Sequence, residues 1–250
     1  MSGEFSFNEN DSLDVMDTYA DLVYCIDLTS SMTPIINKVK ETARKLHSDL
    51  QELMLKNYQR NIKRLRIKVI GFRDAYCDGP LSFEVSKFFN LPMETDEFER
   101  FVNSLTAKGG GDIPENSLEA LALAMKSDWC QTLDNNIRRR HIILMFTDAP
   151  AHMLEQANYG IDQFYPADMP KDYSDLVDWW GQQSSKRSNV RITTDNIAKR
   201  IGIFAPEGAY PWNLIEEDFD NCLISYINPN EGGRDISTTR ILKMLSETLA

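Results

Sequence analysis

The stretch Leu22-Val23-Tyr24-Cys25-Ile26-Asp27 decides the fold class of this chain, because five apolar residues run without a break and stop at an acid. Strands that alternate apolar and polar residues bury one face, whereas an uninterrupted run is typical of a strand buried on both faces of a parallel sheet. The next residues, Leu28-Thr29-Ser30-Ser31, are small and polar and predict a turn at the carboxyl end of that strand.

Working outward, the apolar period changes to three and four residues between Thr33 and Lys56, which predicts a long amphipathic helix. Further strands are expected at 65–72, 83–89, 142–146, 201–205 and 222–227, and further helices at 94–105, 116–126 and 237–249. This alternation predicts an α/β fold, a doubly wound and mostly parallel central sheet with helices on both faces. The second strand, 65–72, could instead be an antiparallel neighbour or an edge strand.

The chain is expected to form one domain over residues 19–250, after a flexible acidic lead-in at 1–18. The segment at about 156–194 is the least regular and is interpreted as an insertion over the rim of the sheet, with a short helix near 173–182. Its pair Trp179 and Trp180 is expected in the core of that insertion, with a ligand platform as the alternative.

The 250 residues carry 27 Lys and Arg against 38 Asp and Glu, a formal net charge of −11. So acidic a chain is a poor binder of nucleic acid or anionic membrane, and it favours cations or basic partners. No run approaches the ~18 consecutive apolar residues of a membrane helix, and no leader is visible, so a cytoplasmic location is expected. The four cysteines form no C-x-x-C pair and are expected to be reduced thiols.

Acidic loops follow three of the expected elements. Asp27, Thr29 and Ser31 follow the first strand, Asp112 and Glu115 end the loop Gly109-Gly110-Gly111, and Asp148 follows the strand at 142–146. Ligands gather beyond the carboxyl ends of strands in such sheets, and carboxylate and hydroxyl oxygens suit a hard cation such as Mg²⁺. The alternative is that Thr29 or Ser31 only caps the following helix, and that the acids favour helix N-termini.

Taken together, the three blocks resemble the von Willebrand factor type A (VWA) domain with its metal-ion-dependent adhesion site. Asp27-Leu28-Thr29-Ser30-Ser31 matches the family pattern D-x-[ST]-x-S, and Gly110 to Glu115 and Thr147-Asp148-Ala149 match the second and third blocks. The middle loop is similar to integrin β I-like domains, and Gly71-Phe72-Arg73-Asp74 is similar to intracellular and α-kinase-linked VWA proteins. Phe204-Ala205-Pro206 and Tyr210-Pro211-Trp212 resemble bacterial tellurium-resistance-associated VWA proteins.

The resemblance implies that the hydroxyls of Thr29 and Ser31 bind the metal directly, and that Asp27 and Asp148 bind it directly or through water. Asp112 or Glu115 would supply the middle-loop ligand. Because no acid stands in Met32-Thr33-Pro34-Ile35, the second, adjacent metal site of integrin β domains is not expected.

These observations predict a non-enzymatic, metal-dependent protein-interaction module in an intracellular, bacterial-type assembly. Mg²⁺ is the expected ion, with Mn²⁺ or Ca²⁺ as alternatives, and an acidic side chain of a partner would complete its shell. The resemblance to bacterial VWA proteins implies kinase- or phosphatase-type proteins among the partners. The competing hypotheses are a Mg²⁺-dependent phosphohydrolase, although Thr29 stands where such enzymes carry a second Asp, and a scaffold that no longer binds metal.

Other polar residues have simpler interpretations. His152 is placed at the rim of the site, whereas His47 and His141 are expected to be structural. Arg73 and Asp74 are expected to form an ion pair beside the site, with a helix cap as the alternative. The run Arg138-Arg139-Arg140 is interpreted as the solvated start of a strand, with a partner patch as the alternative.

Overall fold

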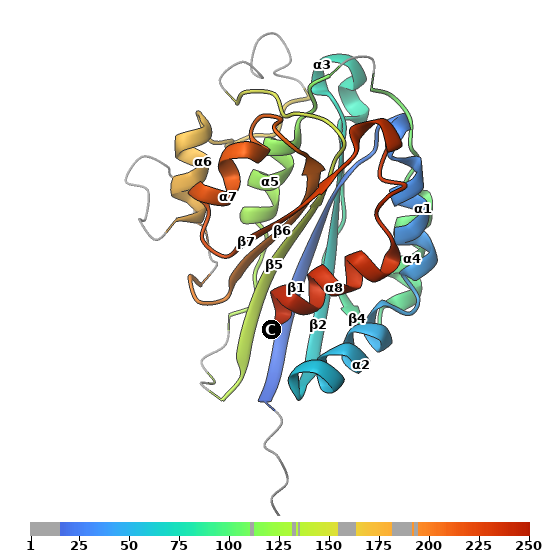
Figure 1. Ribbon diagram of the computed structural model, residues 1–250, viewed down its shortest axis with the longest axis vertical. Coiled ribbons are helices and arrows are strands. Elements are labelled where there is room, and N and C mark those ends of the chain that lie inside the picture. Colours follow the sequence, from blue (N-terminus) through green and yellow to red (C-terminus); the bar gives the residue numbers. More distant parts are fainter. Residues whose placement is uncertain are drawn as a thin grey trace, which may run out of the picture.

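The structure is a computed structural model that describes residues 16–110, 113–131, 134, 136–154, 164–181, 192 and 195–250 (Figure 1). Its core is one seven-stranded sheet in the order β3-β2-β1-β5-β6-β7, with β4 pairing with β2. The strands are β1 (Met16–Asp27), β2 (Arg60–Phe72), β3 (Phe83–Val85), β4 (Phe89–Leu91), β5 (Arg138–Phe146), β6 (Lys199–Pro206) and β7 (Cys222–Ile227).

The sheet is mostly parallel, which confirms the predicted fold class. β1 lies parallel to both β2 and β5, and β6 continues the parallel order to β7. Only the short strands β3 and β4 run antiparallel, both against β2. β2 is therefore a parallel neighbour of β1, and the alternative of an antiparallel or edge position for it was wrong.

Helices cover both faces of the sheet (Figure 1). One face carries α1 (Thr33–Thr42), α2 (Leu46–Tyr58), α4 (Thr95–Ser104) and α8 (Thr238–Leu249), and the other carries α5 (Ser117–Met125), α6 (Tyr173–Trp180) and α7 (Trp212–Asp218). Short helical turns, α3 (Ala75–Asp78) among them, lie in the connections. Along β1, Leu22 and Ile26 belong to the first core while Val23 and Cys25 belong to the second, as expected of a strand buried on both faces.

The structure corrects two predicted elements. The helix expected from Thr33 to Lys56 is two helices, because the chain makes a turn between Thr42 and Leu46 in which the Lys45 amide donates to the Thr42 carbonyl. The strand expected at 83–89 is also two, β3 and β4. The Ser86 side chain between them accepts from the Val69 amide at 2.8 Å and so takes the place of a ladder hydrogen bond.

The boundaries of the predicted segments shift as well. β1 begins at Met16, so the lead-in ends earlier than residue 18, and residues 1–15 lie outside the described part of the chain. Asp17 extends the strand because it accepts from Asn61 and pairs with Lys63 on β2. Much of the expected insertion, 155–163 and 182–191, also lies outside the described residues, whereas Trp179 and Trp180 are buried in the core, as predicted.

None of the four cysteines forms a disulfide, and Cys25 and Cys130 are buried. Among the described residues, no helix combines the length and the apolar character needed to cross a membrane.

Candidate metal centre

Asp27 is the last residue of β1 and organises the loop that follows it. Its carboxylate is fully buried, and Oδ1 accepts from both the amide and the hydroxyl of Thr29, at 2.9 and 2.6 Å. Thr29 precedes the short 3₁₀ turn Ser30–Met32 but makes no capping hydrogen bond with its side chain. The capping alternative is therefore wrong for Thr29, whose hydroxyl lies against a carboxylate instead.

The loop after β5 joins this arrangement from the neighbouring strand. The Thr147 hydroxyl donates to Asp27 Oδ2 at 2.9 Å, across 120 positions of sequence. Ser31 donates a side-chain hydrogen bond to Asp148, and its Oγ lies 3.3 Å from Thr29 Oγ1. Two hydroxyls thus lie between the carboxylates of Asp27 and Asp148, as the sequence predicts for adjacent parallel strands.

The glycine loop lies directly on Thr29. The Ser30 hydroxyl donates to the Gly109 carbonyl at 3.1 Å, and the Lys108 amide donates to the Leu28 carbonyl at 2.9 Å. Gly110 has a φ of +78°, and a Cβ there would come within 2.9 Å of Thr29 Cβ. Glycine is therefore required at position 110 both for its backbone conformation and for the close approach of the two loops.

Of the two middle-loop candidates, the structure describes Glu115, which lies at the site. Asp112 lies outside the described residues. Hydrogen bonds hold the backbone of Glu115 beside the loop after β5: the Glu115 amide donates to Pro150 and its carbonyl accepts from the His152 amide. Its side chain is 2% exposed, Oε1 lies 3.6 Å from the Cβ position of Gly110, and Oε2 has no hydrogen-bond partner.

Burial raises the pKa of all three carboxylates, and neighbouring acids raise the pKa of Glu115 and Asp27 further. Burial raises the pKa of Glu115, and the charges of Asp27, Asp74, Asp78 and Asp148 raise it further. The pKa of Asp27 is raised by burial and then by Asp148, and that of Asp148 is raised by burial. No ion pair with a Lys or Arg of the described residues offsets these charges.

A hard cation fits this set of oxygen atoms. Buried carboxylates without a counter-charge are costly, and the unpartnered Glu115 oxygen is an acceptor that a cation would satisfy. In the described parts of the chain, however, no three His, Cys, Asp or Glu side chains converge closely enough to hold a metal by themselves. The fit therefore depends on the two hydroxyls as ligands and on water or a partner for the remaining positions.

The loop after β2 adds two acids, Asp74, which the sequence placed beside the site, and Asp78, which sequence reasoning missed. Asp74 accepts from the Tyr76 amide and so caps α3, and its Oδ1 lies 3.1 Å from His152 Nε2. Asp78, at the end of α3, lies 3.4 Å from the Gly110 amide. Both follow the carboxyl end of a strand, which is the signal that could have identified Asp78 as well.

Arg73 does not pair with Asp74, so the predicted ion pair is wrong and the capping alternative holds for Asp74. The Arg73 side chain is fully buried and pairs with Glu84 at 2.9 Å. It also donates to the carbonyls of Lys108 and Thr106, at 3.0 and 2.8 Å. Arg73 therefore positions the start of the glycine loop rather than an acid of the site.

Known proteins share parts of this sequence. The family model described as von Willebrand factor A domain matches residues 89–163, which include the second and third blocks. Alpha-protein kinase vwkA of Dictyostelium discoideum is 29% identical over 150 residues, 60% of this chain and 21% of that protein. A putative ariadne-like RING finger protein of Acanthamoeba polyphaga mimivirus is 27% identical over 165 residues, 63% and 14% respectively. The chain thus spans only a small part of the length of these curated relatives.

Two solved structures are similar to this chain over most of its length, at low sequence identity. A von Willebrand factor type A protein from Catenulispora acidiphila is 11% identical, with a TM-score of 0.47, over 93% of this chain and 43% of its own. The pilus adhesin SpaC from Lactobacillus rhamnosus GG is 12% identical, with a TM-score of 0.48, over 93% and 30% respectively.

Proposed function

We propose that this chain, in which residues 89–163 match the von Willebrand factor A (VWA) domain model, is a protein-interaction module that binds its partners through a divalent metal. One observation carries this proposal. The hydroxyls of Thr29 and Ser31 lie together between Asp27 and Asp148, on loops that follow two adjacent parallel strands.

In this proposal Thr29 and Ser31 hold the metal through their hydroxyl oxygens, while Asp27 and Asp148 hold it directly or through water. Glu115 is the middle-loop ligand, since its unpartnered oxygen belongs to the same group of acids. These donors are all oxygen atoms, which favours Mg²⁺ and allows Mn²⁺ or Ca²⁺. The bound ion would supply a positive charge beside the buried carboxylates of Asp27, Glu115 and Asp148.

An Asp or Glu side chain from the partner would complete the coordination shell. Without a metal, an acidic partner would meet the acidic rim and a chain whose net charge is −11. That repulsion is screened beyond about 8 Å at physiological salt, so the metal decides the interaction at close range. We therefore expect partner binding to require the metal.

Kinase- or phosphatase-type proteins stay the expected partners, and one curated relative is named an alpha-protein kinase. The intracellular, bacterial-type assembly also stays a prediction. The phosphohydrolase hypothesis is the alternative, and it has a direct test: turnover of a generic phosphate ester that Asp27→Asn abolishes would replace the interaction module with an enzyme.

The metal alone is the probe that tests the proposal. Isothermal titration of the chelator-treated protein with Mg²⁺ and Mn²⁺ should show saturable binding, and Thr29→Ala should abolish it. Thr33→Ala is the matched control, because Thr33 is exposed just beyond the loop and its hydroxyl donates to the Ser30 carbonyl. Absence of saturable binding by the wild-type protein, or equal loss in the two variants, would overturn the proposal.

A further inference from the structure

Among the described residues, the last strand of the sheet, β7, has a neighbouring strand on one side only. It pairs with β6 and ends the strand order at that edge. Its six residues, Cys222-Leu223-Ile224-Ser225-Tyr226-Ile227, contain no charge and no proline, and they pair with β6 in an unbroken register. Edge strands of soluble proteins are usually short, bulged, or marked with lysine or proline, because a bare edge pairs with other chains. β7 carries none of these features.

The opposite edge of the sheet shows how this fold protects a strand. β3 has only three residues, and one of them, Glu84, pairs with the buried Arg73 at 2.9 Å. β4, which also lies against β2, is equally short. A short strand that carries a charge offers little to a pairing partner. The open edge at β7 is therefore a feature of that strand and not of the sheet as a whole.

Every second residue of β7 turns its main-chain groups away from β6. The Asn221 carbonyl accepts a hydrogen bond from a main-chain amide of β6, so Asn221 faces that strand. Main-chain groups alternate between the two sides of a strand, so those of Cys222, Ile224 and Tyr226 point outward. Arg240 donates to the Tyr226 carbonyl at 3.2 Å and closes one end of the edge. The described residues give the outward groups of Cys222 and Ile224 no hydrogen bond.

Two large apolar side chains of β7 are exposed on opposite faces of the sheet. Leu223 and Tyr226 are each 40% exposed, and their odd spacing places them on different faces. A helix or loop that docked on one face would cover only one of them. An added strand would place side chains beside both, because cross-strand neighbours contact each other on each face. The pattern of exposure therefore favours a strand as the occupant.

Acids without a partner lie beside this edge. Partial burial raises the pKa of Tyr226, and the charges of Glu216 and Glu207 raise it further, so both carboxylates lie near the strand. Both are exposed, and no Lys or Arg of the described residues pairs with either. An acidic edge attracts a basic segment. It also repels a second copy of this chain, whose net charge is −11.

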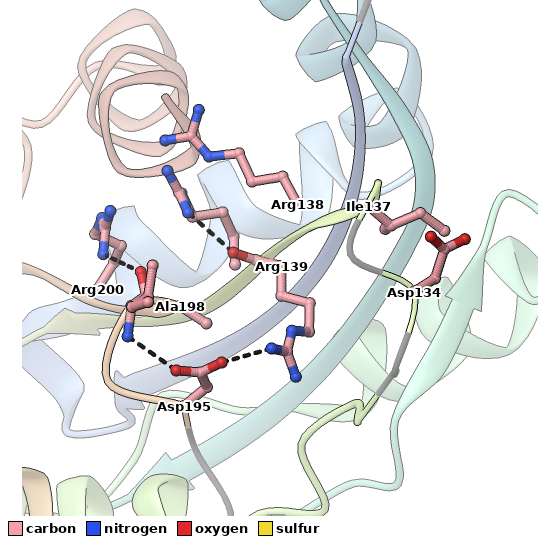
Figure 2. Close-up of a pocket in the computed structure, with 9 residues that line it drawn as sticks. Asp134, Ile137, Arg138, Arg139, Asp195, Ala198 and Arg200 are labelled. Atoms are coloured by element: carbon pink, nitrogen blue, oxygen red, sulfur yellow. Dashed lines mark hydrogen bonds and ion pairs between the residues drawn. The ribbon is translucent and has the colours of Figure 1, made fainter.

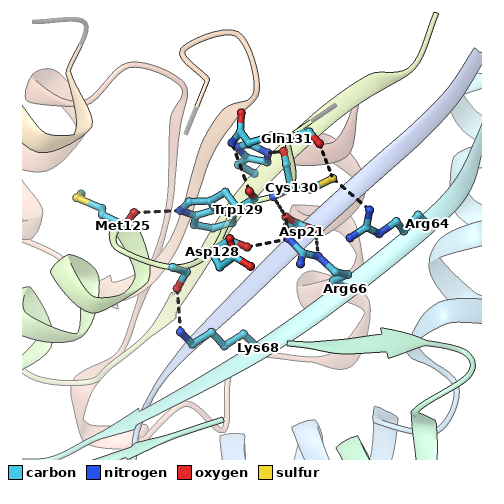
Figure 3. Close-up of polar contacts among 11 residues, drawn as sticks. Asp21, Arg64, Arg66, Lys68, Met125, Asp128, Trp129, Cys130 and Gln131 are labelled. Carbon is cyan, nitrogen blue, oxygen red and sulfur yellow. Dashed lines mark hydrogen bonds and ion pairs between the residues drawn. The ribbon is translucent and has the colours of Figure 1, made fainter. Parts of the chain in front are cut away.

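Acids on other strands and loops find a cation within the chain. Figure 2 shows Asp195 paired with Arg139 at the start of β5, at 2.6 Å. Figure 3 shows Asp21 on β1 paired with Arg66 on β2. The acids beside β7 have no such partner, so the charge that matches them comes from outside.

We propose that the free edge of β7 is a docking site for an extended, basic segment of a partner protein, which adds a strand to the sheet. The main-chain groups of Cys222 and Ile224 give the segment its hydrogen bonds. Leu223 and Tyr226 contact its apolar side chains, and the acids beside the edge select Lys or Arg at the positions between them. This surface uses no metal and is therefore separate from the interaction proposed above.

Fluorescence anisotropy of labelled peptides tests the proposal, in chelator so that the metal site takes no part. The probes are three short peptides, which alternate Lys with Val, Glu with Val, and Lys with Pro. Only the Lys–Val peptide should show saturable binding. The Glu–Val peptide is repelled by the acids, and proline removes the N–H groups that a strand ladder needs.

Leu223→Lys should weaken binding of the Lys–Val peptide about tenfold or more, because it removes an apolar contact and adds a like charge. Leu55→Lys is the matched control, since Leu55 is 43% exposed on α2, which packs against β2. It should bind as the wild type does. Hydrogen exchange supplies a second readout, because the bound peptide should slow exchange of the outward amides of Cys222 and Ile224.

Three results would overturn the proposal. The first is the absence of saturable binding of the Lys–Val peptide. The second is equal affinity of the wild type and Leu223→Lys, or binding that leaves the two amides unprotected. The third is self-association of the wild type that Leu223→Lys abolishes, since the edge would then pair with a second copy. Because the titration contains chelator, its outcome is independent of the proposed metal function.

Discussion

The two ends of the sheet differ in how their charges are matched. At the carboxyl ends of β1 and β5, Asp27, Glu115 and Asp148 lie together without a cation of the described chain. Where β5 and β6 begin, Arg139 pairs with Asp195, and Arg138 and Arg140 donate to the main-chain oxygen of Ala250. Arg66 on β2 is likewise paired, with Asp21. The difference teaches that the chain matches its own cations at one end, whereas the acids at the other end have no counter-charge from the described residues, and that is the end at which we propose a bound cation.

The largest expected effect is the loss of metal-dependent stability in Asp27→Asn. A ligand that binds only the folded state at 100 times its Kd adds about 2.7 kcal/mol to the free energy of unfolding. We expect Mg²⁺ to stabilise the wild-type protein in this way and to leave Asp27→Asn unchanged, as measured by urea unfolding with and without chelator.

Asp96→Asn is the control for that measurement, because Asp96 is 84% exposed and lies on α4. It should keep the full response to Mg²⁺. A response that survives in Asp27→Asn would mean that the ion binds elsewhere.

The next effect comes from the glycine loop. Gly110→Ala should lose about 1 kcal/mol of stability from its positive φ and, in addition, about tenfold in metal affinity, because the new Cβ pushes against Thr29. Gly208→Ala is the matched control: its φ is +72°, but nothing lies within 4 Å of the added Cβ. Titration calorimetry should therefore show weaker metal binding only in Gly110→Ala. Equal affinities of the two variants would show that the contact between position 110 and Thr29 does not affect metal binding.

Glu115→Gln should change stability mainly in the presence of metal. In chelator the pKa of Glu115 is raised to about 10, so its carboxyl is protonated at neutral pH, and replacing it by a neutral amide should change the free energy of unfolding by less than about 1 kcal/mol. In saturating Mg²⁺ the variant should gain less than the wild type, because a ligand is lost.

Glu119→Gln provides the comparison for Glu115→Gln, since Glu119 is equally buried but accepts from the Tyr165 hydroxyl at 2.8 Å. Its response to Mg²⁺ should equal that of the wild type. If Glu115→Gln responds in the same way, Glu115 is not a ligand.

The smallest expected effect is the coupling between the two ends. Asp27 ends β1, whereas Arg200 is the second residue of β6, and no hydrogen bond or ion pair of the described residues links them. In a double-mutant cycle, Asp27→Asn and Arg200→Ala should therefore be additive in unfolding free energy within about 0.5 kcal/mol. A larger coupling would show that the two ends of the sheet do not contribute independently to stability.

Much of the fold could be predicted from residue patterns. The apolar run at 142–146 predicted the buried strand β5, and the run at 222–227 predicted β7, which lies at the edge of the sheet and is largely half-exposed. The final helix was predicted to within one residue. The break between α1 and α2 could not be predicted, because the apolar stripe continues across the turn and both helices pack on the same core. The role of Ser86 could not be predicted either, because a polar residue inside a strand pattern does not show whether its side chain accepts a hydrogen bond from a main-chain amide of the neighbouring strand.

The candidate site, too, could be predicted only in part. Asp27, Thr29, Ser31 and Asp148 were predicted because each follows a buried strand, and the structure brings them together. The role of Thr147, whose hydroxyl binds Asp27, depends on the register between β1 and β5. The turn of Arg73 away from Asp74 depends on where the carbonyls of the glycine loop lie.

By itself the sequence determined which segments are buried strands, and therefore that acids and hydroxyls would gather where those strands end. Only the tertiary structure decided that Glu115 lies beside Thr29 and that Arg138, Arg140 and Arg200 share one face while Arg139 pairs with Asp195. The physical reason is that periodicity records the local backbone state and its burial. Which charges meet depends on strand register and loop path, and these are set by packing between segments far apart in the chain.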